Sequence, residues 1–326
     1  MSEALARFQT NEGKTYPLYP QIANEKVYFA NRFGITIVGD IFYPPDFTAS
    51  KRYPAIVVSH PHGGVKEQSG GLYAQEMATK GYVALAIDLS YNGESGGAVR
   101  HISTPEGFVE DILAAIDYLG TRDFVERERL GVIGICGSGG FAVSAACFDP
   151  RIRAVATISM YDMGKGTRQG VGNAVSLAER RKILQHVAEQ RWREFTGAPI
   201  EYIGTFPRVI TEEVLAGSDP IRQEFLEYYC TKRGRHIQST GQITTNSTVA
   251  LMSFYPFANM DLLAGRPILI VSGDISHSRE FSEDCYQQAQ EPKELYLVPG
   301  ASHTDLYDNK DKIPFAKLTA FFNAAL

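Results

Sequence analysis

The residues with the clearest chemical potential lie between positions 130 and 140, where the sequence is LGVIGICGSGG. A buried strand that runs directly into a tight glycine-rich turn and then a helix is the context of a nucleophile elbow, which exposes one reactive side chain. With Cys136 as that side chain, the flanking Gly134, Ser138 and Gly139 are all small, as the close contact between strand and helix requires. A thiol at a helix N-terminus is also expected to have a lowered pKa.

Ser138 is the alternative nucleophile in the same motif. With Ser138 at the top of the turn, Phe141 would fall three residues later and crowd the contact between helix and strand. The spacing therefore favours Cys136 as the nucleophile, and Ser138 is then expected to be one of the substrate-binding residues beside it. A third interpretation is that Cys136 is an inert core cysteine, which is common for this residue type, and the partners described next argue against it.

His303 is the expected general base. It ends the stretch LVPGASH, just past the last predicted strand, and therefore lies at the carboxyl edge of the sheet, where the elbow also emerges. A neighbouring imidazole can accept a thiol proton and give a thiolate–imidazolium pair. His277 follows the preceding strand and is a candidate for the lining of the site.

Two aspartates are alternatives for the acid that orients the imidazole. Asp274 directly follows the strand PILIVSG, and Asp162 follows the strand AVATISM in the same way. Either carboxylate could hold the imidazole in place and stabilise its charged form. Each could equally be a loop-capping aspartate, so both assignments stay open.

Two backbone N–H groups are expected to form an oxyanion hole. One belongs to Gly137, directly after the nucleophile, and the other lies in the HPHGG loop, at His62 or Gly63. Glycine lets the backbone approach a substrate oxygen closely. Neither a P-loop nor a dinucleotide fingerprint fits GICGSGG, since no Gly-Lys-Ser/Thr follows and the glycine spacing differs. We expect no metal and no cofactor.

Alternating strands and helices are expected to position these groups. The strands are almost continuously apolar, which is typical of a parallel sheet covered by helices on both faces. An antiparallel hairpin is expected first, over residues 25–44. Strands are predicted at 53–59, 82–88, 130–135, 154–159, 267–273 and 294–298, and helices at 72–80, 105–119, 140–147, 281–290 and 314–326.

The alternation stops at residue 164 and resumes after residue 259. The intervening residues are rich in charge and aromatic side chains, and their pattern is helical without a convincing strand. We expect one core domain, residues 1–163 and 260–326, interrupted between its sixth and seventh strands by a helical cap, residues 164–259. The cap is expected to select the substrate and to contribute nothing to the chemistry itself. The aromatic residues expected to line the pocket are Tyr161, Trp192, Phe195, Tyr228 and Tyr229.

The composition narrows the functional classes. The chain has 326 residues, 44% of them hydrophobic, with a net charge of −5 that argues against nucleic acids and anionic membranes as partners. No apolar run approaches the roughly 20 residues of a membrane span, and no secretory signal is evident. Four scattered cysteines indicate neither zinc nor disulfides and suit a reducing cytoplasm. We expect a cytoplasmic protein with a small-molecule partner, and the sequence leaves a homo-oligomer open.

Together these motifs resemble the α/β-hydrolase superfamily. The HPHGG loop, the DLSYNGES stretch, the GICGSGG elbow and the GASH loop follow one another in the order of that family, from about residue 25 onward. Within the superfamily, the cysteine elbow looks like that of dienelactone-hydrolase-like bacterial enzymes. These families often place the acid a few residues past the glycine after the seventh strand, and that position is Ser276 here, which keeps both Asp274 and Asp162 open.

The resemblance implies an α/β fold and a hydrolase that cleaves an ester, lactone or thioester. Cys136 would attack the carbonyl, His303 would accept and return the proton, and Gly137 with the His62–Gly63 loop would hold the oxyanion. Two alternatives use the same residues. One is an acyltransferase whose acceptor is not water, and the other is a ligand-binding protein that has kept the fold and lost catalysis.

Overall fold

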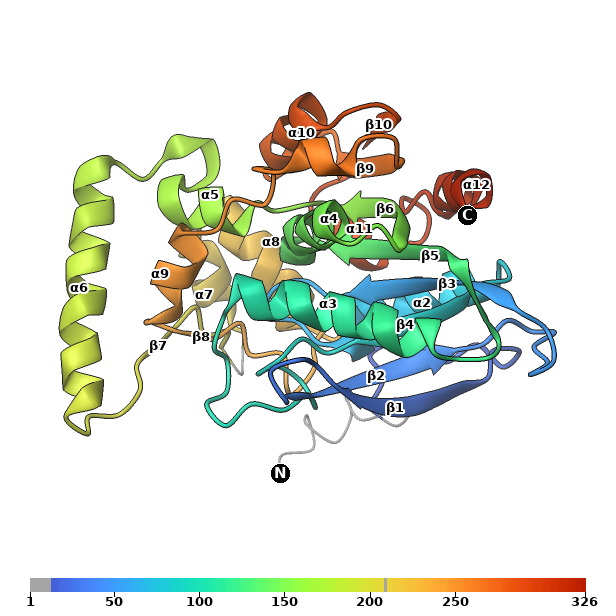
Figure 1. The fold of residues 1–326 in the computed structure, drawn as a ribbon. Helices are drawn as coiled ribbons and strands as arrows, with labels where there is room; N and C mark the ends of the chain where they lie inside the picture. Colours follow the sequence, from blue (N-terminus) through green and yellow to red (C-terminus); the bar gives the residue numbers. More distant parts are fainter. Residues whose placement is uncertain (1–12, 208–209) are drawn as a thin grey trace.

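The central sheet carries eight strands in the order β1-β2-β4-β3-β5-β6-β9-β10 (Figure 1). The computed structural model describes residues 13–207 and 210–326. β1 and β2 form an antiparallel pair, β2 is antiparallel to β4, and the remaining neighbours are parallel. The strands are β1 (Asn24–Ala30), β2 (Thr36–Phe42), β3 (Tyr53–Ser59), β4 (Val83–Ile87), β5 (Val125–Ile135), β6 (Ile152–Ile158), β9 (Ile268–Gly273) and β10 (Lys293–Val298).

Helices cover both faces of this sheet, as the apolar strands predict. Alternate residues of β3 point to opposite sides, so that Val57 belongs to one apolar cluster and Ile56 and Val58 to the other. α3 (Pro105–Gly120), α4 (Gly137–Phe148) and α10 (Arg279–Gln288) contribute to the first cluster. α2 (Gly71–Ala78), α11 (Asp305–Asp308) and α12 (Phe315–Ala325) contribute to the second.

The sequence predicts these elements closely. The hairpin over residues 25–44 is confirmed by β1 and β2, whose register joins Ala30 to Thr36 across the turn. Every other predicted strand and helix of the core is present, with ends that differ by a few residues. The fold class, a mostly parallel sheet flanked by helices, is therefore confirmed.

Residues 164–259, the inserted segment, lie between β6 and β9 in the sequence, and the described part of the segment gathers at the left of Figure 1, with α6 outermost. The segment is mainly helical, and it also contains a two-stranded antiparallel sheet that its sequence pattern does not reveal. That it forms a separate cap domain stays a prediction. Its elements, beginning one residue earlier, are α5 (Met163–Gln169), α6 (Leu177–Phe195), β7 (Tyr202–Ile203), α7 (Glu212–Ala216), α8 (Pro220–Tyr229), β8 (Ile243–Thr244) and α9 (Ser247–Met252).

Among the helices of the described residues, none is both long enough and apolar enough to span a membrane.

Candidate active site

The turn between β5 and α4 places Cys136 in a strained backbone conformation. Its φ of 55° and ψ of −122° are rare for a residue with a side chain, and such strain is retained where the surroundings enforce it. The Cys136 N–H donates to the carbonyl of Ile158 at 2.9 Å, and its own carbonyl accepts from Gly139 and Tyr161. Small neighbours are required, because a Cβ on Gly134 would lie 2.3 Å from the Ser138 carbonyl oxygen. The turn therefore holds Cys136 at the sharp bend between β5 and α4.

Ser138 points away from this turn and into the fold. Its side chain is fully buried, and its hydroxyl donates to the carbonyl of His60 at 2.5 Å. The hydroxyl thus joins the first turn of α4 to the loop after β3. This contact gives Ser138 a structural role in place of the nucleophilic or substrate-binding roles considered from the sequence.

The Cys136 thiol has three hydrogen-bond partners. They are the Tyr307 hydroxyl and the backbone N–H groups of Gly137 and His62. Burial raises the pKa of Cys136 to about 11, and these three hydrogen bonds lower it only in part. The sequence-based expectation of a lowered thiol pKa is therefore wrong, because desolvation outweighs the helix N-terminus.

His303 is fully buried and is held at both ring nitrogens. Nδ1 lies 2.6 Å from the Ser278 hydroxyl, and Nε2 lies 2.8 Å from the Tyr307 hydroxyl. Burial moves the pKa of His303 well below its usual value, and His277 adds to the shift. The imidazole is therefore neutral at pH 7, as a general base must be. Because Tyr307 contacts both partners, its hydroxyl bridges the imidazole and the Cys136 thiol.

Neither aspartate proposed from the sequence reaches the imidazole. Asp274 accepts the N–H of Gly300 at 2.7 Å, and Asp162 caps α5 by accepting the N–H of Lys165 at 2.8 Å. Both are loop-capping residues, the alternative that the sequence left open. This corrects the expectation of an aspartate on Nδ1, where the structure places the Ser278 hydroxyl.

Glu224, in α8 of the inserted segment, is a carboxylate that the sequence reasoning missed. One oxygen accepts the backbone N–H of Thr304 at 2.6 Å, and the other lies 3.1 Å from Nδ1 of His277. Burial alone would raise the pKa of Glu224, but hydrogen bonds from His277 and Thr304 lower it to about 2. The ring centroids of His277 and His303 are 4.7 Å apart, so His277 lies beside the site as its position after β9 suggested.

In the HPHGG loop, the backbone N–H of His62 points at the Cys136 thiol, and the ring of His62 bonds to Ser103 instead. Nε2 of His62 lies 2.6 Å from the Ser103 hydroxyl, and burial lowers the pKa of His62 to about 4. Gly63 has a φ of 77°, and a Cβ there would lie 3.2 Å from the Cα of Gly241 in the inserted segment. The predicted loop therefore brings one amide, that of His62, to the thiol alongside the amide of Gly137.

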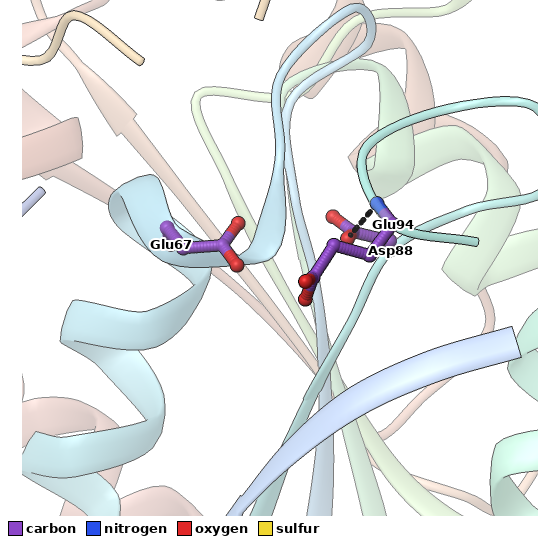
Figure 2. Close-up of side chains that lie close together, drawn as sticks. All are labelled: Glu67, Asp88 and Glu94. Atoms are coloured by element: carbon purple, nitrogen blue, oxygen red, sulfur yellow. Dashed lines mark hydrogen bonds between the residues drawn. The ribbon is translucent and has the colours of Figure 1, made fainter. Parts of the chain in front are cut away.

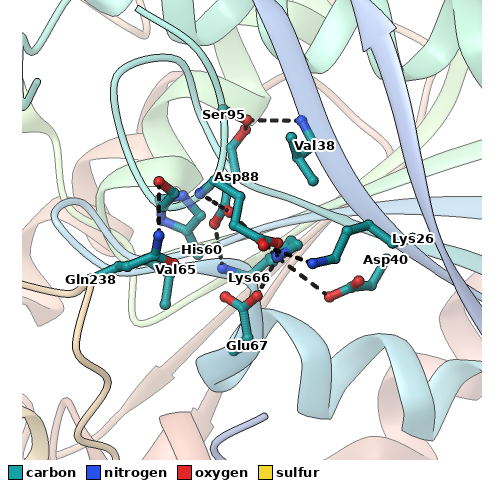
Figure 3. A network of polar contacts seen from close by, with 12 residues as sticks. Lys26, Val38, Asp40, His60, Val65, Lys66, Glu67, Asp88, Ser95 and Gln238 are labelled. Carbon is teal, nitrogen blue, oxygen red and sulfur yellow. Dashed lines mark hydrogen bonds and ion pairs between the residues drawn. The ribbon is translucent and has the colours of Figure 1, made fainter. Parts of the chain in front are cut away.

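A buried ion-pair network lies beside this loop (Figure 3). The Lys66 ammonium, fully buried just after the loop, lies 2.6 Å from a carboxylate oxygen of Glu94 and also pairs with Glu67. Asp88 accepts the backbone N–H groups of Lys66 and Glu94, both at 2.8 Å. The DLSYNGES stretch thus fixes the loop that carries the His62 amide.

The same network contains three carboxylates whose oxygens lie within 4.8 Å of one another, those of Glu67, Asp88 and Glu94 (Figure 2). Such a group could hold a cation. Here the Lys66 ammonium lies within 4.0 Å of all three, so a lysine provides the positive charge that they require. The chemistry of this donor set is that of a structural ion-pair network.

A cavity of about 220 Å³ opens onto the Cys136 thiol. Of the described residues that line it, none is an aspartate, glutamate, lysine or arginine. Aromatic rings dominate, which suits an uncharged apolar group. The lining residues are His62, Cys136, Tyr161, Met163, Phe206, Phe225, Tyr229 and Gly241.

The expected aromatic lining is correct in part. Tyr161 and Tyr229 line the cavity, and Tyr228 lies against Tyr229 with its hydroxyl on Tyr16. Trp192 and Phe195 do not, since they are 77% and 92% exposed on α6. Their assignment to the pocket is wrong, because the helical pattern of α6 does not tell which side meets the body of the protein. Phe206 and Phe225 take that place, and no motif marks them in the sequence.

Comparison with known proteins agrees with this fold. The chain is 42% identical to the uncharacterised protein PA2218 of Pseudomonas aeruginosa over 96% of this chain and 84% of that protein. The crystal structure of PA2218 superposes with a TM-score of 0.91, covering 97% of this chain and 98% of that one. The α/β-hydrolase GrgF from Penicillium superposes with a TM-score of 0.75 at 20% identity over 93% and 99% of the two chains, which shows that the fold is shared.

Two further findings concern function. The acyltransferase drtE of Aspergillus calidoustus is 26% identical to this chain over 80% of the chain and 82% of drtE. Residues 42–189 match the model of the dienelactone hydrolase family, a span that includes both the HPHGG loop and the elbow. The chain therefore belongs to the same protein family as PA2218, and it carries a segment that is similar to the dienelactone hydrolase family.

Proposed function

We propose that this protein cleaves an ester, lactone or thioester bond of a small molecule, with Cys136 as nucleophile and His303 as general base. One observation carries the proposal. The strained turn holds the Cys136 thiol against two backbone N–H groups and against a hydroxyl that is itself bonded to a neutral imidazole. These are the three parts that nucleophilic acyl transfer needs: a nucleophile, a base and donors for an oxyanion.

The thiol must lose its proton during the attack rather than before it. A pKa of about 11 leaves on the order of one thiol in ten thousand ionised at pH 7. In the proposed step, the thiol proton passes to the Tyr307 oxygen as the Tyr307 hydroxyl proton passes to Nε2 of His303. The sulfur then forms a bond to the carbonyl carbon, and the carbonyl oxygen becomes an oxyanion. Ser278 keeps the ring oriented through Nδ1.

The negative charge is stabilised by the amides of Gly137 and His62, which already point at the sulfur. The carbonyl then re-forms, the bond to the leaving group breaks, and the leaving oxygen or sulfur takes the proton from Nε2 of His303. Water attacks the resulting acyl-Cys136 thioester in the same manner. Its proton goes to the imidazole, the acid leaves, and the Cys136 thiol is restored.

The cavity favours a small, uncharged and apolar acyl group. Phe206, Phe225 and Tyr229 from the inserted segment line it together with Tyr161 and Met163, and none of the described lining residues carries a charged side chain that could pair with an anionic substrate. Acyl transfer to an acceptor other than water is the second candidate. It passes through the same acyl-Cys136 intermediate, and the named activity of drtE favours it.

The proposal is tested by mixing the protein with p-nitrophenyl butyrate and measuring both the nitrophenol burst and the mass of the protein. We expect a butyryl group on Cys136, no activity in Cys136→Ala or His303→Ala, and retained activity in Cys147→Ala, which removes a second buried cysteine in α4. Activity in a folded Cys136→Ala variant would refute the assignment. Absence of both nitrophenol release and an acyl-enzyme would favour a ligand-binding protein.

A further inference from the structure

Among the described residues, no carboxylate is hydrogen-bonded to the ring of His303, although a protonated imidazole in a buried site needs compensating charge. Its Nδ1 partner is the uncharged Ser278 hydroxyl, 2.6 Å away. Transferring a proton to a fully buried imidazole creates a positive charge away from water, which is costly without a nearby negative charge. The source of that negative charge therefore decides how well His303 can act.

Several elements face the His303 ring, and they supply groups of different charge. α11 contributes the Tyr307 hydroxyl, and the loop before α10 contributes Ser278 and His277. The segment between β6 and α5 contributes the Tyr161 ring. α8 of the inserted segment contributes the Phe225 ring and, one residue earlier, the carboxylate of Glu224. Glu224 is the acidic residue of this set: Phe225, Glu224, Tyr161, Ser278, His277 and Tyr307.

Glu224 is hydrogen-bonded to the loop that carries His303. Its carboxylate accepts the N–H of Thr304, the residue directly after His303, at 2.6 Å, and it is also hydrogen-bonded to the Ser302 side chain directly before. Its second oxygen lies 3.1 Å from His277, whose ring is tilted by 30° to that of His303. The carboxylate therefore has contacts on both chain neighbours of the base and on the ring packed against it.

We propose that Glu224 provides the negative charge that stabilises the protonated form of His303, so that the inserted segment supplies a positioning residue to the catalytic apparatus. This inference rests on the proposed role of His303 as base. It replaces the expectation that the chemistry needs nothing from residues 165–259. Glu224 acts through space and through His277 and Thr304, and it does not touch the reacting atoms.

Two further contacts support this dependence on the inserted segment. Arg233, which follows α8, donates to the Thr304 carbonyl at 2.8 Å and to its hydroxyl at 3.1 Å, and it is anchored by Asp308 at 2.7 Å. Thr304 is thus held on its N–H by Glu224 and on its carbonyl by Arg233. The inserted segment fixes the backbone beside His303 and places a carboxylate beside its ring.

The decisive comparison is between Glu224→Gln and Glu224→Asp. Glutamine keeps the length of the side chain and can accept the Thr304 N–H, but it removes the charge. Aspartate keeps the charge, but it is shorter and weakens the contact with Thr304. If charge matters most, kcat for an activated ester should be lower in Glu224→Gln than in Glu224→Asp. Glu227→Gln, which removes an exposed carboxylate from the same helix, is the matched control.

We expect kcat to fall about tenfold in Glu224→Gln, equivalent to one pKa unit of lost stabilisation, with KM changed less than threefold. The acidic limb of the kcat/KM profile should also move to lower pH, because an imidazolium without its carboxylate loses its proton more readily. Glu227→Gln should change neither quantity. A Glu224→Gln variant more active than Glu224→Asp, or an acidic limb that does not move, would overturn the proposal.

This outcome is separable from failure of the proposed function. The Cys136 acyl-enzyme and the inactivity of Cys136→Ala test the nucleophile and do not depend on Glu224. If both hold while Glu224→Gln behaves like Glu227→Gln, the hydrolase assignment stands and the role of Glu224 is refuted.

Discussion

Tyr307→Phe tests the central feature of the proposed mechanism, the hydroxyl between base and nucleophile. The Tyr307 oxygen lies 2.8 Å from Nε2 of His303 and is also hydrogen-bonded to the Cys136 thiol. Phenylalanine removes both contacts and preserves the ring, which packs 5.2 Å from the His303 ring. The substitution therefore removes the proposed proton path with little change in packing.

We expect kcat to fall about 100-fold, the lower end of the range for general acid–base catalysis. This corresponds to about 2.7 kcal/mol of lost transition-state stabilisation. Stability should fall by about 1–3 kcal/mol, because Nε2 of His303 is left buried without a hydrogen-bond partner. Tyr228→Phe is the matched control. It removes a buried hydroxyl that contacts Tyr16 at 3.0 Å, from a ring that packs 4.9 Å from Tyr307.

The assay is steady-state hydrolysis of p-nitrophenyl butyrate, with urea unfolding of each variant to separate activity from stability. Tyr228→Phe should lose stability and keep its kcat within threefold. The reasoning is refuted if Tyr307→Phe also keeps kcat within threefold while Cys136→Ala is inactive. In that event His303 accepts the thiol proton directly, and the Tyr307 hydroxyl only fills space.

Three further outcomes are expected. Alkylation of Cys136 by iodoacetamide should accelerate with every unit of pH up to about 11, and peptide mapping across a pH series measures this. Lys66→Met should lower the free energy of unfolding in urea by about 3–5 kcal/mol, because it leaves buried carboxylates unpaired, whereas Lys26→Met, at a 40% exposed side chain, should cost less than about 1 kcal/mol. Phe225→Ala should change the ratio of kcat/KM between long and short acyl esters, and Trp192→Ala should not, since Phe225 lines the cavity and Trp192 is exposed on α6.

The pKa shifts of Lys66 and Glu94 determine how the stability contributed by this network depends on pH. The pKa of Lys66 is raised by its carboxylate partners despite burial, so its stabilising contribution is complete below the unfolded value near 10.4 and is lost as the pH rises further. The pKa of Glu94 is lowered to about 2 by Lys26 and Lys66 although burial opposes the shift. The Glu94 contribution is therefore present above about pH 4.3 and is lost on acidification towards pH 2.

Local patterns explain what the sequence could predict. The turn around Cys136 needs small residues within a few positions, so Gly134 and Gly139 mark it without any knowledge of the rest of the chain. The apolar strands and the helical spacing of α3 are equally local. Because the parallel strands all end at the same edge of the sheet, topology alone predicts that His303 lies close to the elbow.

Contacts between distant segments explain what the sequence could not predict. The pKa of Cys136 depends on how completely other segments bury it, and a helix N-terminus says nothing about that. Asp274 and Asp162 each follow a strand at the carboxyl edge of the sheet, yet the carboxylates of both accept hydrogen bonds from nearby backbone amides. Glu224 lies about eighty residues before His303 in a segment without a recognisable motif. Tyr307 could have been proposed from the sequence, since it follows His303 by four residues, about one helical turn.

The contacts of Thr304 link substrate selection to proton transfer. Phe206, Phe225 and Tyr229 line the acyl cavity, while Glu224, in the same helix as Phe225 and Tyr229, holds the loop of the base. A substitution that shifts α8 as a whole would reshape the cavity and also move the Glu224 carboxylate relative to His303. Under the proposed roles of Glu224 and His303, such a substitution is expected to change acyl preference and the strength of the base together.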